Sequence, residues 1–400
     1  MATPETRIIV NLPSYREVME EVKAEVLKLV GEKVLEFQEE QFYTWFGKPW
    51  QRERDARGIV LCPQCSSSPG FERRGKRERL FSTHYGKVES ALLQVTCKRC
   101  GCTFSPFVGF FSEKGKQYSR DLVESLVLSA LTVSYHETSR RAGREAGIKA
   151  AAITVWRQLK EAYHRYERRE KKANSNSGGI LFADSTGVKT GKTKRGSSLN
   201  LALKVTGREF RGKRAVLKKE LVTLSVGKWR EDELKSVNAD LSVTDGDPEL
   251  KGVLRHTHPS LPSQRCLFHA PRDLYWTLYR DGVEGEERAY WGGRLLSEIW
   301  KPSANGIVGV DRLIADLDSK GRSSTATYLR NARNELLTVT RLKEQGMAPE
   351  LVMVATGPVE TGFREINRRT EIGARWTDEG AERVARLLEE VRLDGTRLEF

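Results

Sequence analysis

The sequence predicts an α/β protein: a mixed β-sheet domain that carries an all-α insertion and follows a cysteine-rich β unit and a group of helices. Two observations support this prediction. After residue 179, strand-like and helix-like segments alternate in the order β-β-β-α-β-α-β, and acidic residues stand where strands end. Before residue 112, two Cys-x-x-Cys pairs flank β-like segments, a pattern typical of small domains that fold around a metal ion. A chain of 400 residues is long enough for two or three such domains.

Composition excludes a membrane-embedded protein and favours a polyanionic partner. No stretch approaches the roughly 20 apolar residues that span a bilayer. The start, MATPETRIIVNLPSYREV, lacks the basic and apolar regions of a secretion signal. The chain holds 68 Lys and Arg against 54 Asp and Glu, a net charge of +14. Such a balance is typical of nucleic-acid binding, although basic charge also serves solubility alone.

The N-terminal segment, residues 1–57, is predicted to be mainly helical. Ser14 and Glu17, three residues apart, have the spacing of a capping box. The apolar seam of this helix consists of Tyr15, Met19, Val22, Val26 and Leu29. We expect the seam to pack on the chain's own core. Because Gly31 ends it after about two heptads, a dimerising coiled coil is the weaker alternative.

Residues 58–112 have the cysteine spacing of a zinc ribbon. The cysteines of the two pairs are Cys62, Cys65, Cys97 and Cys100, with 31 residues between the pairs. Together they offer the four tetrahedral thiolates of a closed structural Zn²⁺ site, and so small a unit needs the ion to fold. We expect strands at 58–62, 91–97 and 102–111. A basic turn before the second strand would contain Arg73, Arg74, Lys76 and Arg77.

The alternative for these cysteines is a set of buried or redox-active thiols, but no thioredoxin-like context accompanies them. Cys102 can replace Cys100 as a ligand, although the Cys-x-x-Cys spacing argues against it. Without a secretion signal, paired cysteines favour metal over disulfides. We therefore expect a reducing compartment, the prokaryotic cytoplasm.

Residues 113–172 are predicted to form a helix-turn-helix unit, in which Gly147 joins helical segments at 136–145 and 149–163. The buried stripe of the last helix consists of Ala152, Val155, Trp156 and Leu159. Its outward, DNA-facing candidates are Lys149, Thr154, Arg157 and Lys160. From 138 to 172 there are eleven Lys or Arg against four Glu, which suits phosphate contacts. An ordinary helical hairpin with a solvated basic face is the alternative.

A linker of Asn, Ser and Gly at 173–179 precedes the predicted catalytic domain, residues 180–270 and 351–400. The segments ILFADSTGVKT, LNLALKVTG, AVLKKELVTLSVG, LSVTDGD and RCLFH predict its five strands. Between residues 186 and 220 lie eleven Lys or Arg against two Glu. Residues 271–350 are predicted to form the helical insertion, with Trp276, Trp291 and Trp300 in its core; the weaker alternative is that one of them stacks on a flipped base near the cleavage point.

Two aspartates stand at the ends of predicted strands: Asp184 after ILFA and Asp245 after LSVT. A carboxylate there is costly unless it has a metal or a charge partner. Two ions about 4 Å apart, held by carboxylates from different strands, are what phosphodiester chemistry requires. The alternative for each residue is a turn or cap aspartate, and Asp247 is a second candidate in the same turn.

The third ligand is expected from a late helix, at Glu360. Arg364, Asn367 and Arg368 share its helix face, which suits a site that holds metal and phosphate together. The rivals are Glu335 in the insertion and Glu365, which points about 140° away from Glu360. A solvated acid in the first turn of a helix is the alternative for Glu360. Cys266 and His269 form a Cys-x-x-His at a predicted strand end, for which we expect a buried structural role beside the site.

In these residues and in their order the chain resembles Mutator-like transposases and their prokaryotic insertion-sequence relatives. In that superfamily an Asp ends a strand, a second Asp lies in a DG-type turn, a C/DxxH and a helical insertion follow, and a Glu closes the site. The resemblance implies a ribonuclease H-like catalytic domain with Asp184, Asp245 and Glu360 holding two Mg²⁺ or Mn²⁺ ions. It also implies cleavage and strand transfer of double-stranded DNA, both terminal repeats and target, by a homodimer or higher oligomer.

Two other functions remain open at this point. A DNA-binding regulator, or a domesticated transposase that no longer cuts, would share the zinc ribbon and the helix-turn-helix. A ribonuclease H-like nuclease or junction resolvase would share the acids but would not protect defined DNA ends.

Overall fold

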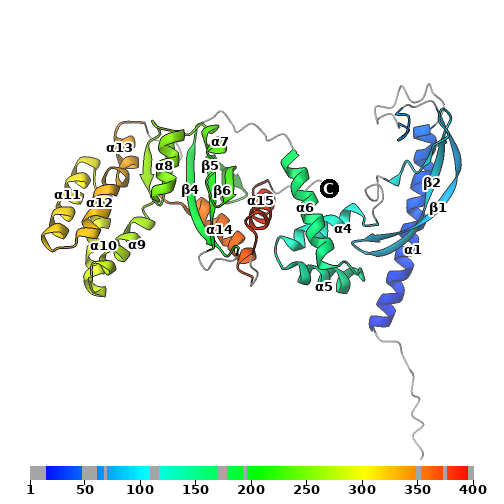
Figure 1. The fold of residues 1–400 in the computed structure, drawn as a ribbon, viewed down its shortest axis with the longest axis horizontal. Helices are drawn as coiled ribbons and strands as arrows, with labels where there is room; N and C mark the ends of the chain where they lie inside the picture. The colour runs from blue at the N-terminus through cyan, green and yellow to red at the C-terminus, as the bar shows by residue number, and fades with distance from the viewer. Residues whose placement is uncertain are drawn as a thin grey trace, which may run out of the picture. The chain divides into compact units, whose positions relative to one another are not determined.

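The protein is a mixed α/β structure, as the sequence predicted, with a three-stranded and a five-stranded sheet and helices around them (Figure 1). The computed structural model describes residues 15–46, 61–66, 70–108, 117–168, 178–191, 196–347, 353–372 and 376–394. Two compact units divide the chain between Ala162 and Tyr163. The sequence placed the main boundary at 173–179, of which only Gly178 and Gly179 are described. No helix among the described residues is long and apolar enough to cross a membrane.

The first unit begins with helix α1 (Tyr15–Phe46) and a hairpin of β1 (Phe71–Thr83) and β2 (Gly86–Cys97). A short strand, β3 (Thr103–Phe104), pairs with the end of β2. The predicted basic turn is wrong: the hairpin turns at His84 and Tyr85, and the basic residues lie along β1, mostly exposed. Of the strand expected at 58–62, the described residues Leu61 and Cys62 belong to no strand.

Helix α1 packs with a different face from the one predicted. Gly31 contacts the backbone of β2, where a Cβ would lie 2.0 Å from the carbonyl oxygen of Glu89. About two turns further, Gln38 donates to the carbonyl of Ala91 at 2.9 Å and accepts from the amide of Leu93 at 3.1 Å. The helix thereby satisfies backbone groups on an edge of β2 that no strand covers at these residues. A glycine at this contact allows the close approach.

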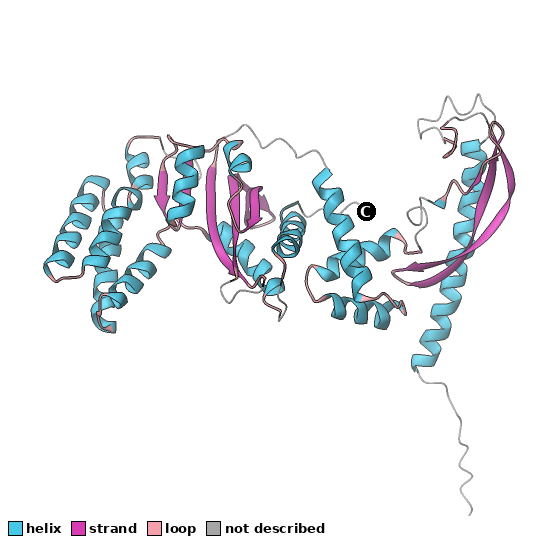
Figure 2. Ribbon diagram, viewed as in Figure 1, coloured by secondary structure: helices cyan, strands magenta, loops and turns pink. Residues whose placement is uncertain are grey.

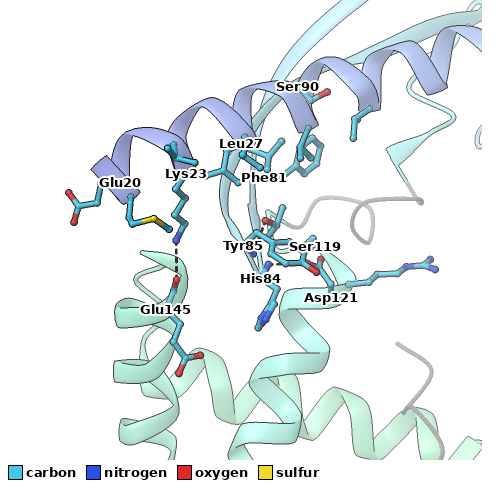
Figure 3. Close-up of a pocket in the computed structure, with 18 residues that line it drawn as sticks. Glu20, Lys23, Leu27, Phe81, His84, Tyr85, Ser90, Ser119, Asp121 and Glu145 are labelled. Carbon is cyan, nitrogen blue, oxygen red and sulfur yellow. Dashed lines mark hydrogen bonds between the residues drawn. The ribbon is translucent and has the colours of Figure 1, made fainter. Parts of the chain in front are cut away.

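The predicted apolar seam lies on the opposite side of α1. Its members Met19, Val26 and Leu29 are 46%, 52% and 53% exposed, so the expectation that the seam packs on the chain's own core is wrong. Met19, Val22 and Val26 of the seam line an open apolar groove of about 1090 Å³. The end of the β1–β2 hairpin, residues 119–121 and Glu145 also line it. In Figure 3, Leu27 and Phe81 line this groove from the two elements.

Three helices follow: α4 (Arg120–Ala130), α5 (Tyr135–Ala146) and α6 (Ala152–Arg168). Ser134 caps α5 by accepting a 3.1 Å hydrogen bond from the amide of Glu137. Gly147 ends α5 with a φ of 69°, a left-handed conformation that glycine adopts without steric cost. The turn between α5 and α6 therefore forms where the sequence predicted it.

The second unit is built on strands β4 (Ile180–Val188), β5 (Ser197–Arg211), β6 (Arg214–Val226), β7 (Leu241–Thr244) and β8 (Ser263–Arg265). Their order is β6-β5-β4-β7-β8; the pairs β6–β5 and β5–β4 are antiparallel, whereas β4–β7 and β7–β8 are parallel. Leu181 and Ala183 face a core shared with α7 (Glu231–Lys235) and α8 (Pro248–Thr257). Helices α14 (Gly357–Thr370) and α15 (Asp378–Asp394) also pack on the sheet, α14 against β4 and β5.

Between β8 and α14 the described residues form helices joined by short loops, with no strand among them (Figure 2). The helices are α9 (His269–Arg280), α10 (Gly285–Ile299), α11 (Ser303–Ser319), α12 (Ser323–Leu336) and α13 (Thr338–Glu344). Trp291 lies in their core as expected. Trp276 and Trp300 are 54% and 69% exposed, so their predicted burial is wrong. The last strand is also shorter than predicted, because the Cys-x-x-His forms the turn into α9.

Candidate metal sites

Strand register brings the two candidate aspartates together. Ala183 of β4 pairs with Thr244, the last residue of the parallel neighbour β7, so Asp184 is the next residue on β4 and Asp245 directly follows β7. The prediction that Asp184 ends its strand is wrong, because pairing with β5 continues β4 to Val188. Thr244 pairs in turn with Arg265 of β8, which places Cys266 at the same edge. Because side chains alternate along a strand, Asp184 points to the face opposite Ala183 and its α7–α8 core.

Helix α14 reaches Asp184 because of a glycine. Leu201 stands directly opposite Asp184 on β5. Gly362 packs against Leu201, where a Cβ would lie only 2.8 Å from a methyl group of that side chain. This contact sets the first turn of α14 beside Asp184, and Glu360 belongs to that turn.

Three side chains form a compact group of potential metal ligands: Asp184, His269 and Glu360, whose ligand atoms all lie within 4.8 Å of one another. His269 Nε2 is 3.0 Å from a Glu360 carboxylate oxygen, and Nδ1 is 4.0 Å from one of Asp184. Sequence reasoning had placed His269 beside the site only as a structural residue. The Cys-x-x-His was the available signal, but periodicity did not show that His269 begins a helix aimed at the acids.

Asp245 lies in the same cavity, of about 310 Å³, but outside the compact group. The residues that line the cavity are Asp184, Ser185, Thr186, Asp245, His269, Arg272, Glu360, Phe363, Arg364 and Asn367. Burial and the nearby charge of Asp245 raise the pKa of Asp184 to about 7. The buried Oδ1 of Asn367 makes no hydrogen bond. A buried carboxylate that resists ionisation and a buried polar atom without a partner both fit a site completed by a cation and a bound ligand.

Cys266 contacts His269 and stabilises the charged form of its imidazole. The amide and hydroxyl of Thr356 donate to its sulfur at 3.4 and 3.5 Å. Burial opposes ionisation of this thiol, but His269 and Thr356 outweigh it and lower the pKa of Cys266 to about 7. Burial likewise opposes the charged form of His269, yet Cys266 and Asp184 raise the pKa of the imidazole.

The rival acids are engaged elsewhere. Asp247 caps α8 by accepting from the amides of Glu249 and Leu250 at 2.9 and 3.0 Å. Glu335 pairs with Arg265 at 3.0 Å and with Lys251 at 2.5 Å, behind the loop that carries Asp245.

On α14 the side chains near Glu360 divide between two environments. Glu365 pairs with Arg368 at 2.9 Å, and neither lines the cavity, although Arg368 was expected on the Glu360 face. Arg364 and Asn367 do line it.

In the first unit, Cys62, Cys65, Cys97 and Cys100 form a cluster that can hold a metal ion such as zinc. The Sγ atoms of Cys62 and Cys100 are 3.5 Å apart. Those of Cys65 and Cys97 are 3.8 Å apart. Four thiolates bound to one Zn²⁺ would lie roughly 3.8 Å from one another. Both pairs sit in equivalent turns, closed by the amides of Ser66 and Gly101 bonding to the carbonyls of Cys62 and Cys97 at 2.9 Å.

The candidate DNA-facing side chains differ in exposure. Lys149 and Arg157 are exposed, whereas Thr154 and Lys160 are half-buried, with Lys160 over the ring of Trp156 at 5.6 Å. Cys102 is outside the four-thiol cluster.

Comparison with protein-family models and with curated proteins finds no match for this chain.

Proposed function

We propose that this chain is a metal-dependent phosphodiester-cleaving enzyme of the ribonuclease H-like class. The observation that carries the proposal is the convergence of Asp184, Glu360 and His269, with Asp245 beside them, where β7 ends alongside the middle of its parallel neighbour β4. The strand order, an antiparallel trio continued by two parallel strands, supports the same class.

Within that class, we propose a DNA transposase of the DDE type that cuts the ends of a mobile element and joins them to target DNA. The order of elements supports this: a four-cysteine unit for structural zinc, then a helix-turn-helix, then acids split by a helical segment. Terminal repeats would contact the exposed Lys149 and Arg157. The enzyme would act as a homodimer or higher oligomer on DNA.

Each side chain in the cavity has a proposed role. Asp184, Asp245 and Glu360 hold Mg²⁺ or Mn²⁺, which supplies the charge stabilisation that phosphodiester cleavage needs. His269 holds the Glu360 carboxylate in place by its 3.0 Å contact. Arg272 and Arg364 line the same cavity and orient the scissile phosphate, because guanidinium groups match phosphate oxygens in charge and geometry.

Incubation with Mn²⁺ and duplex DNA from the regions flanking the coding sequence tests this function. We expect end-specific cleavage and joined products, and a footprint over defined repeats. Asp184→Ala and Asp245→Ala should abolish cleavage but leave DNA binding intact, whereas Asp247→Ala should remain active because Asp247 caps α8. Protection without any cleavage would indicate a regulator. Cleavage of branched DNA without an end-specific footprint would indicate a resolvase.

A further inference from the structure

One face of helix α9 extends the candidate site with exposed aromatic and basic side chains. Measured around the helix from His269, residues 272, 273, 276, 279 and 280 all fall within about 80° of it. The core side of the helix is occupied instead by Ala270, Leu274 and Leu278. Trp276 is 54% exposed and Tyr279 60%, although aromatic side chains of this size contribute most to stability when buried. We call Arg272, Asp273, Trp276, Tyr279 and Arg280 the α9 face; within it, Arg272 pairs with Asp273 at 3.2 Å.

The aromatic rings of this face are held in place. Trp276 makes edge contacts with Tyr275 and Tyr279, with ring centroids 6.2 and 6.1 Å apart. Arg288 of α10 lies over both tyrosine rings, 4.3 Å from Tyr275 and 5.1 Å from Tyr279. Ordered rings lose little conformational freedom when a ligand stacks on them, so the face is prepared for binding.

The face is continuous with the cavity. Arg272 lines the cavity wall, and His269, the first residue of α9, belongs to the ligand group. Trp276 lies seven residues further, about 10 Å along the helix axis. That distance corresponds to about three base-stacking steps of 3.4 Å.

We propose that the α9 face binds unpaired nucleotides of the DNA strand whose phosphate occupies the cavity, with bases stacking on Trp276 and Tyr279. This inference rests on the proposed function. Aromatic rings interleaved with cations are the chemistry that binds single-stranded nucleic acid without strong sequence preference. Continuity with the cavity favours a nucleic-acid strand over a protein partner at this face. So does its charge, because Arg272, Arg280 and the adjacent Arg288 outnumber the single acid, Asp273.

The test uses the full chain in an Asp184→Asn background, so that DNA is bound but not cut. The probes are two duplexes of the same sequence, one fully paired and one with four unpaired nucleotides that include 2-aminopurine. Trp276→Leu and Tyr279→Leu remove the aromatic ring and keep apolar volume. Trp300→Leu is the matched control, since Trp300 is 69% exposed at the end of α10 and does not belong to the α9 face.

We expect Trp276→Leu to weaken binding of the unpaired probe about tenfold, in line with the loss of one base stack, and to relieve 2-aminopurine quenching. Binding of the paired probe and the control variant should be unchanged. Equal losses on both probes, no loss on either, or a change in self-association alone would overturn the inference. If the parent chain cleaves DNA with Mn²⁺ while Trp276→Leu binds both probes normally, only this inference fails. If the parent chain neither binds nor cleaves DNA, the proposed function fails with it.

Discussion

The guanidinium of Arg265 donates a 2.6 Å hydrogen bond to the backbone carbonyl of Asp245. The same group fills the space beside Gly246, where a Cβ would lie 1.5 Å from it. Arg265 is in turn paired with Glu335 at 3.0 Å, and both side chains are largely buried. The ion pair between Arg265, at the end of β8, and Glu335, on α12, therefore holds in place the loop that carries Asp245.

Replacing Arg265 should destabilise the second unit and impair cleavage together. Arg265→Met removes the hydrogen bond to Asp245 and leaves Glu335 paired with Lys251 alone. Because that partner remains, we expect a loss of about 3 kcal/mol, the lower end of the range for breaking a buried pair. Chemical denaturation measures the loss. Arg333→Met is the control, because its pair with Asp311 is half exposed and should contribute under about 1 kcal/mol. Equal losses in the two variants would contradict the role given to Arg265.

Gly362→Ala should reduce cleavage by more than it reduces stability. The added methyl group meets a terminal methyl of Leu201 at 2.8 Å and the carboxylate of Glu389 at 3.3 Å. Because Leu201 is fully buried and has little room to shift, we expect α14 to move away from β5 and take Glu360 with it. We expect at least a tenfold loss of cleavage, because a shift of about 1 Å near a reacting group has effects of this size or larger. Gly252→Ala is the control: it lies in α8 with no atom within 4 Å and should stabilise by about 1 kcal/mol. An active Gly362→Ala would show that α14 adjusts without moving Glu360.

Without metal, Asp184 should destabilise the protein at neutral pH. Burial and Asp245 raise its pKa from 3.8 to about 7 in the folded state. The folded state therefore binds the proton more tightly than the unfolded state, and stability falls as pH rises through this window. Asp184→Asn should raise the melting temperature at pH 8 and have little effect at pH 4, with roughly 2–4 °C for each kcal/mol in a unit of this size. Calorimetry in a chelator at both pH values checks this; a larger gain at pH 4 would refute the sign.

One Zn²⁺ per chain should depend on four cysteines and no others. Cys62→Ser removes one ligand of the cluster, and elemental analysis should find the ion lost or bound far more weakly. Loss of zinc should also loosen the core that includes Phe71, Leu93 and Phe107, seen as increased hydrogen exchange in β2. Cys102→Ser should keep a full equivalent of zinc, because Cys102 stands outside the cluster. If Cys62→Ser retained zinc and Cys102→Ser lost it, Cys102 rather than Cys62 would be the zinc ligand.

Local pattern was sufficient for several features of this chain. Short, largely apolar runs identified β4 and β7, and the residue after each run was Asp184 or Asp245, although β4 itself continues to Val188. Short spacings placed the Cys-x-x-Cys turns and the glycine turn between α5 and α6. These features depend on residues a few positions apart, whose geometry the backbone itself dictates.

Only the tertiary structure decided which faces are covered and which side chains meet. Helix α1 has two apolar sides, and periodicity could not show that Gly31 and Gln38, rather than the seam of Met19 and Val26, contact β2. His269 joins Asp184 and Glu360 because β8 ends four residues earlier than α9 begins, a distance that neither helical nor strand periodicity describes. His269 is 85 positions from Asp184 and 91 positions from Glu360 along the chain. The three side chains meet only through packing, which is a property of the whole sheet and its helices.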